Sequence, residues 1–332
     1  MSKRAAKNTS RSTSSRSKSK KKSVSATAIL MIVAAALIIV IAAIAVGAGC
    51  NGRKSSTSTE TPAAEDINVE VVTNEAGEVI SSGTTAVEVA RQDLVNTDQI
   101  QIEITGIDAN NAAGFTINLE MENKSDTTYV VAAKYAMVEG LNIDPKWSSE
   151  VPAGQVKESS ITFYKSDYAS YGITFTDIQI VLSVVEASDT ETQVLQQAVR
   201  IYPYGEDAAR VYMRTATDKD IVLVDNDSYR MTLVGTEKDD VWGFTAKVYI
   251  ENKTDVNVWF AGSNVTVNGS SLDPFWGVAA PAGSSTYSSI CWTNSQLSGI
   301  GDVSEIAMTV TATNYDDWDA LTIATDDIVI RP

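Results

Sequence analysis

Clusters of aspartate residues are the part of this sequence that comes nearest to a catalytic or metal-binding arrangement. They occur at Asp225–Asp227, Asp239-Asp240, Asp316–Asp319 and Asp326-Asp327. A glycosidase needs two carboxyl groups held roughly 5–10 Å apart across a cleft, and calcium takes oxygen ligands from loops. No EF-hand spacing is present, and aspartates between strands are typical of solvated turns. We therefore predict no catalytic residue, metal site or cofactor, and a loop calcium site stays open as an alternative.

The sequence has no histidine and only two cysteines, Cys50 and Cys291. The lack of histidine excludes Ser-His-Asp triads, Cys-His dyads and His-ligated zinc sites. One cysteine ends a hydrophobic run and the other lies deep in the C-terminal part, so we do not expect a disulfide between them. These counts indicate a protein that is not an enzyme, with a carbohydrate-active enzyme as the least favoured alternative.

Charge is distributed unevenly along the chain. Nine of the 26 basic residues, and none of the 42 acidic residues, lie within residues 1–25. Residues 26–332 therefore hold 17 basic and 42 acidic residues, a net charge of −25. Phosphate contacts need clustered lysine and arginine, so the acidic body excludes nucleic acid as its partner. We interpret residues 1–25 as a disordered basic tip.

An uncharged run from Val24 to Cys50 follows this tip. Its apolar centre, from Ile29 to Val46, is long enough with its flanks to cross the roughly 30 Å hydrocarbon core of a bilayer as a helix. We predict one transmembrane signal-anchor helix over residues 26–49. The positive-inside rule places the basic tip in the cytoplasm and residues 51–332 outside the cell membrane.

Two other fates of this segment stay open. Small residues near its end would allow cleavage by signal peptidase. The sequence Gly47-Ala48-Gly49-Cys50 also has small residues before a cysteine, as in a lipobox, which makes Cys50 a candidate for lipidation. Gly47 departs from that pattern, because a large aliphatic residue is usual there. All three alternatives leave residues 51–332 outside the membrane.

The chain repeats itself at an offset of 129 residues, as Trp147 and Trp276 show. Further matches are ENKSD at Glu122–Asp126 with ENKTD at Glu251–Asp255, Asp144-Pro145 with Asp273-Pro274, Pro152–Gly154 with Pro281–Gly283, and, after a one-residue slip, Ile178 with Ile306. We call residues 90–203 the first copy and residues 217–332 the second copy. Residues 204–216 link them, and residues 51–89 form a Ser/Thr-rich tether with a candidate hairpin.

Both copies show hydrophobic residues at every second position. Ile100, Ile102 and Ile104, for example, alternate with polar residues. This period predicts antiparallel strands with one buried face. About seven short strands in about 115 residues are typical of an immunoglobulin-like β-sandwich. The predicted fold class is therefore all-β, with two tandem immunoglobulin-like β-sandwich domains after a single N-terminal transmembrane helix.

The shared motifs carry a resemblance to a known group of domains. A strand ending in EN-K-S/T-D, then DP-x-W, then PAG before a serine-rich strand resembles uncharacterised immunoglobulin-like domains of Gram-positive membrane-anchored surface proteins and lipoproteins. The resemblance covers both copies, about two thirds of the chain. It implies surface-displayed β-domains, and it implies no functional residues because that group has no established activity.

Two of the four tryptophans that occur only in the second copy are candidates for ligand contact. Trp242 stands where the first copy has alanine, and Trp318 stands at a polar position, Asp189 or Thr190. Both lie beside acidic loop residues, with Tyr315 near the second of them. Exposed aromatic residues can stack on sugars or anchor a protein partner. We therefore predict Trp242, Trp318 and Tyr315 as ligand contacts, and the second copy as the recognition end.

These observations indicate a non-enzymatic protein of the cell surface, anchored in the membrane. We expect its tandem sandwiches to bind a cell-envelope glycan or a protein partner. A purely structural stalk, or a scaffold for a membrane complex, is the alternative function. A binding module should expose aromatic residues on one copy only, whereas a stalk should expose none.

Overall fold

The computed structural model describes residues 72–73, 79–80, 91–239, 243–317 and 322–332. The predicted basic tip and anchor helix lie outside the described residues. Within those residues, no helix is long and apolar enough to cross a membrane. Strands β1 (Val72–Thr73) and β2 (Val79–Ile80) pair with each other in antiparallel orientation.

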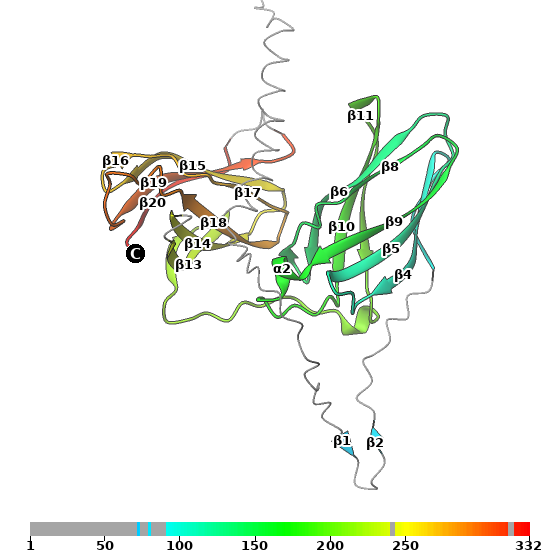
Figure 1. Cartoon of the computed structure of the whole chain (residues 1–332), viewed down its shortest axis with the longest axis horizontal. Helices are drawn as coiled ribbons and strands as arrows, with labels where there is room; N and C mark the ends of the chain where they lie inside the picture. The colour runs from blue at the N-terminus through cyan, green and yellow to red at the C-terminus, as the bar shows by residue number, and fades with distance from the viewer. Residues whose placement is uncertain (1–71, 74–78, 81–90, 240–242, 318–321) are drawn as a thin grey trace, which may run out of the picture. The chain divides into compact units, whose positions relative to one another are not determined.

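The first copy consists of two antiparallel sheets around one hydrophobic core (Figure 1). One sheet has the order β3-β4-β5-β9, with β3 Gln92–Asn96, β4 Ile100–Asp108, β5 Gly114–Asn123 and β9 Val156–Tyr164. The other has the order β11-β10-β6-β7 with β8 paired to β6, and its strands are β6 Tyr129–Val138, β7 Leu141–Asn142, β8 Ser148–Val151, β10 Ile178–Glu186 and β11 Asp189–Ile201. A short helix, α2 (Lys165–Tyr168), follows β9.

The second copy has the same strand pairings around its own core. One sheet contains β12 Ile221–Asp225, β13 Tyr229–Asp239, β14 Gly243–Asn252 and β18 Ser285–Trp292. The other contains β15 Val258–Val267, β16 Ser270–Ser271, β17 Gly277–Ala280, β19 Ile306–Asn314 and β20 Ala324–Ile330. A 3-10 turn, η1 (Glu206–Ala208), lies between the copies. Five strands, β3 and β5 to β8, recur with the same length 129 residues later as β12 and β14 to β17, whereas β10 recurs 128 residues later as β19.

Burial follows the period of two that the sequence shows. Ile100, Ile102 and Ile104 of β4 are fully buried, while Gln101 and Glu103 between them face outward. Because the two sheets each turn one face inward, these alternating side chains fill the space between them. The prediction of an all-β protein with sandwich-like packing is thus confirmed for the described residues.

The asparagine of the ENKSD and ENKTD motifs holds a turn together from inside. Asn123 is buried, and its side-chain amide donates to the backbone carbonyls of Thr127 (2.8 Å) and Val151 (2.9 Å). Its side-chain oxygen accepts the N–H of Ser125 at 3.0 Å. Asn252 makes the equivalent bonds in the second copy. The repeated motif is therefore a structural clamp, since buried polar groups need such partners.

Tight turns between β6 and β7, and between β15 and β16, repeat a second clamp. Glu139-Gly140 and Asn268-Gly269 all have positive φ, as a two-residue hairpin turn requires. The buried Glu139 carboxylate accepts hydrogen bonds from the backbone and hydroxyl groups of Thr174 and Thr176. Glu139 thus fixes the loop before β10. Asn268 accepts the N–H groups of Ser304 and Glu305, and so fixes the loop before β19.

Candidate functional site

A sheet of the first copy continues into a sheet of the second. Strand β7 pairs in parallel with β18, where Ser285 lies opposite Leu141 and donates its N–H to the carbonyl of Gly140 at 2.9 Å. The side-chain amide of Asn142 donates to the carbonyl of Ala279 at 3.0 Å. The nine-stranded sheet that results contains strands of both copies. Backbone hydrogen bonds therefore connect the two copies directly.

Four tyrosines and one arginine surround this connection, and we call them the junction cluster: Tyr171, Tyr212, Arg214, Tyr249 and Tyr287. The rings of Tyr171 and Tyr287 stack, and the hydroxyls of Tyr212 and Tyr287 lie 2.7 Å apart. The guanidinium carbon of Arg214 lies 5.6 Å from the centre of the Tyr249 ring. Burial, and then the bond to Tyr212, raise the pKa of Tyr287. The Tyr287 ring also contacts those of Tyr212 and Tyr249, so the four rings pack together around the connection.

An ion pair between the segment that joins the copies and the start of the second copy fixes Arg214 in place. Both of its terminal nitrogens donate to the Asp220 carboxylate, one of them at 2.7 Å, and the two side chains are only 13% and 10% exposed. Thr217 donates its N–H and its hydroxyl to the same carboxylate. These hydrogen bonds, first of all those from Arg214, hold the pKa of Asp220 well below its usual range. A bidentate pair of this kind sets both distance and orientation, so it closes the segment into a loop.

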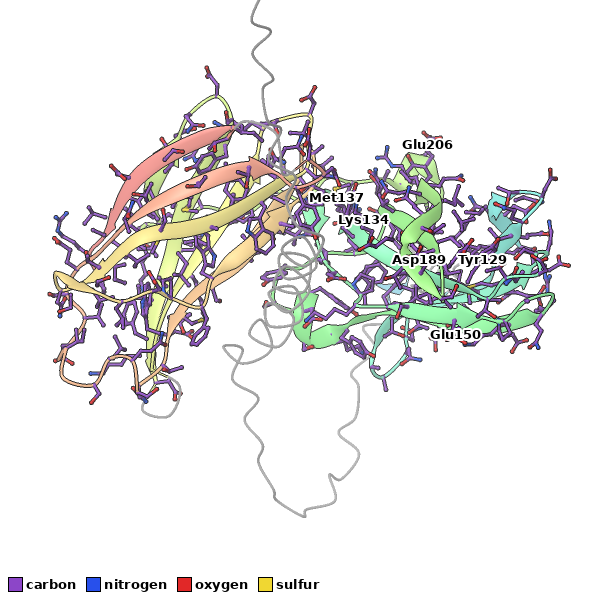
Figure 2. All side chains as sticks on the ribbon, turned by 90° about the horizontal axis from the view of Figure 1, so that it is seen from above. Tyr129, Lys134, Met137, Glu150, Asp189 and Glu206 are labelled. Carbon is purple, nitrogen blue, oxygen red and sulfur yellow. The ribbon has the colours of Figure 1, made fainter. Side chains whose placement is uncertain are left out.

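A second contact between the copies involves Lys134 of β6, which is labelled in Figure 2. Its ammonium group lies 2.9 Å from the Asp316 carboxylate. The side-chain amide of Asn257 donates to the Tyr135 hydroxyl at 2.8 Å and to Asp316 at 2.6 Å. Four side chains of the two copies are thus held in one polar network, and Tyr315 joins it by donating its backbone N–H to the Asn257 carbonyl at 2.8 Å.

Tyr315, one of the predicted ligand contacts, lies at this junction. It is half-buried, and its ring stacks on that of Trp259 with 5.9 Å between centroids. Burial is the main cause that raises the pKa of its hydroxyl. Tyr315 therefore has a structural contact that the sequence did not indicate.

Trp242 and Trp318 lie outside the described residues. The described residues beside them lie at opposite ends of the second copy. Gly243 starts β14 next to Phe244, which pairs with Trp292 at the end of β18. Asn314, which ends β19, pairs with Val258 at the start of β15. Tyr315 follows Asn314 directly and so belongs to the end that faces the first copy.

Exposed aromatic residues occur once in each copy of the described chain. Tyr164 is 50% exposed in the first copy, and Phe275 is 47% exposed in the second. The expected contrast between the copies rests on Trp242 and Trp318, which lie outside the described residues, and therefore stays a prediction. Phe275 is not among the residues that we predicted from the sequence. A signal was present, because the first copy has the polar residue Lys146 at the same place in the DP-x-W motif.

The other repeated aromatic positions are structural. The indole N–H of Trp147 donates to the Ser159 hydroxyl, and that of Trp276 donates to the Ser288 hydroxyl, each at 3.1 Å. Trp292 is fully buried in the second core, as its replacement of Phe163 predicts. These residues stabilise the two cores.

The aspartate clusters bind other parts of the protein. Asp326 accepts hydrogen bonds from the Tyr229 hydroxyl (2.9 Å) and the Asn226 side chain (3.0 Å). Asp225 forms an ion pair with Lys253 at 2.7 Å. Across the described ranges, no group of three or more acidic, histidine or cysteine side chains is placed to hold a metal ion.

Cys291 lies buried in β18 and forms a disulfide bond. This corrects the expectation that neither cysteine is paired. Cys50, the only other cysteine of the chain and the candidate for lipidation, lies outside the described residues. A disulfide within the chain and lipidation of Cys50 would exclude each other, because both use the same sulfur.

No protein-family model and no curated protein matches the chain. Solved structures that match the chain include the YadV chaperone, with a TM-score of 0.23 and 14% sequence identity, over 71% of this chain and 100% of the chaperone. A chain in the complex of the Salmonella enterica SafA pilin with the SafB chaperone matches with a TM-score of 0.18 and 12% sequence identity. The match covers 71% of this chain and 98% of that chain. Red sea bream transglutaminase matches with a TM-score of 0.21 and 12% sequence identity, over 71% of this chain and 32% of that enzyme.

Proposed function

We propose that this chain is a non-enzymatic protein of the cell surface, anchored by its N-terminal helix, whose two immunoglobulin-like copies act as one rigid unit. The unit displays a protein-binding surface outside the membrane. The observation that carries the proposal is the connection between β7 and β18, with the junction cluster around it. A flexible tandem array would need no such contacts, since linked domains move relative to each other unless their interface is extensive.

The order of the strands supports the immunoglobulin-like assignment. In the first copy, β4, β5 and β9 share one sheet, and β6, β10 and β11 share the other. In the second copy, β13, β14 and β18 are divided from β15, β19 and β20 in the same way. That division is the one that defines immunoglobulin-like sandwiches. The uncharged run of residues 24–50 and the nine basic residues before it support the anchor.

Two measurements on the full chain test this function. Calorimetry in detergent should show a single cooperative transition for both copies, and two independent transitions would contradict the rigid unit. Protease treatment of intact cells should digest residues 51–332 and spare the basic tip. Recovery of the whole chain in the soluble fraction would contradict the anchor.

A further inference from the structure

Half of the exposed large hydrophobic side chains in the described residues lie within one short stretch. Val211 and Met213 are 76% and 85% exposed, and Ile221 and Val222 are 48% exposed each. We call these four residues the linker patch. Exposed apolar side chains that gather in one place mark interaction sites more often than scattered ones do.

The ion pair between Arg214 and Asp220 links the two chain segments that carry the patch. Met213 directly precedes Arg214, and Ile221 directly follows Asp220. Because the bidentate contact holds residues 214 and 220 together, it limits how far apart the two halves of the patch can lie.

The fold itself does not require apolar residues on β12. Strand β3 of the first copy has the same length and place in its sheet, and there Gln92 and Asp93 stand for Ile221 and Val222. Asp93 accepts hydrogen bonds from the side chains of Asn96 and Gln101. Since polar residues serve the first copy, the apolar pair of the second copy needs another explanation.

The backbone beside the patch also has an open edge. The N–H groups of Arg210 and Tyr212 point inward, to the Thr176 hydroxyl (3.1 Å) and the Glu139 carbonyl (2.7 Å). The N–H groups of Val211 and Met213 have no acceptor among the described residues. Residues 211–214 alternate between exposed and half-buried, as an edge strand does. Such an edge can accept an added strand.

We infer that the linker patch docks an extended strand of another protein that carries aliphatic side chains and a positive net charge. Aliphatic side chains do not offer the aromatic face on which sugars stack. The exposed acidic residues near the patch in the chain, Glu206, Asp207 and Asp218, outnumber the exposed basic residues, Arg210 and Lys219. This balance disfavours an anionic membrane. The net charge of −25 on residues 26–332 likewise opposes another molecule of this chain and favours a basic partner. The inference rests on the proposed function, because it locates the proposed protein-binding surface at the linker patch.

The test is a titration of the full chain in detergent micelles with a fluorescent peptide, acetyl-Lys-Val-Thr-Val-Thr-Val-Lys-amide. We expect saturable binding and slower hydrogen exchange at the amides of Val211 and Met213. The variant Met213→Gln/Ile221→Gln should bind at least about tenfold more weakly, which corresponds to 1.4 kcal/mol. Glutamine is tolerated at the matching position of the first copy, so this variant should fold.

A matched control replaces two exposed apolar residues elsewhere, Val156→Gln and Val329→Gln, and should leave the affinity unchanged. No saturable binding up to about 1 mM peptide, or equal affinity in patch and control variants, would overturn the inference. So would dimerisation of the chain that only the patch variant abolishes, because another molecule would then be the occupant. Protease accessibility and calorimetry report on the proposed function separately, so the docking site can fail while anchor and rigid unit stand.

Discussion

The phenol rings of Tyr171 and Tyr287 stack face to face, with centroids 4.3 Å apart and planes inclined by 4°. Tyr171 lies in the loop after α2 of the first copy, and Tyr287 lies in β18 of the second. Tyr212, from the segment between the copies, contacts the same ring and hydroxyl. Tyr287 of the second copy thus contacts both the first copy and the segment between the copies.

Removal of this side chain should uncouple the copies. Tyr287→Ala loses the stack and the hydroxyl contact, and should lower the free energy of unfolding by about 3 kcal/mol. Tyr287→Phe keeps the ring and should cost about 1 kcal/mol. Urea unfolding of the full chain, followed by tryptophan fluorescence, measures both. Tyr164→Ala, at an exposed position, is the control and should stay within about 0.5 kcal/mol.

Acid should weaken the ion pair that closes the linker loop. Because Arg214 depresses the pKa of Asp220 in the folded state, the pair stabilises the protein above the unfolded pKa of about 3.9. This stabilisation is lost as the pH falls from there toward the folded pKa. Asp220→Asn lacks it at every pH. The difference in urea midpoint between the two proteins should therefore shrink between pH 7 and pH 3, and a constant difference would contradict the assignment.

Two glycines should tolerate no side chain, because backbone carbonyls occupy the space. A Cβ at Gly114 would lie 1.8 Å from the oxygen of Phe163, and one at Gly243 would lie 2.1 Å from that of Trp292. Gly114→Ala and Gly243→Ala should each cost about 3 kcal/mol or more. Gly154→Ala has open space and only its positive φ to overcome, which costs about 1–2 kcal/mol. Thermal unfolding of the three variants compares them directly.

The clamp in the ENKTD turn should require an amide. Asn252→Asp replaces the donor to the carbonyls of Val256, Ala280 and Pro281 with a second acceptor. A buried carboxylate facing carbonyl oxygens should cost about 3 kcal/mol at pH 7. Asn264→Asp changes the same residue type at an exposed position and should cost less than about 0.5 kcal/mol. Equal losses in the two variants would show that the buried amide is not the cause.

Local signals in the sequence were sufficient for some elements and misleading for others. Asn268-Gly269 is a turn signal by itself, whereas Glu139-Gly140 gives no such signal and adopts the same turn because threonines from a later loop bind the carboxylate. The exposure of Tyr315 could not be judged from its acidic neighbours, since it depends on Trp259 beneath its ring. The sequence likewise contained no indication of a disulfide at Cys291, and the structure has one there.

By itself, the sequence determined the all-β character, the 129-residue register and the turn role of Asn123 and Asn252. Those features depend on residues close together in the chain, or on a pattern that occurs twice. Only the tertiary structure decided how the copies meet, through Tyr171, Tyr287 and the pairing of β7 with β18. The physical reason is that these partners are distant in sequence and have no counterpart in the repeat. No period, motif or internal comparison can therefore indicate their contact before the chain has folded.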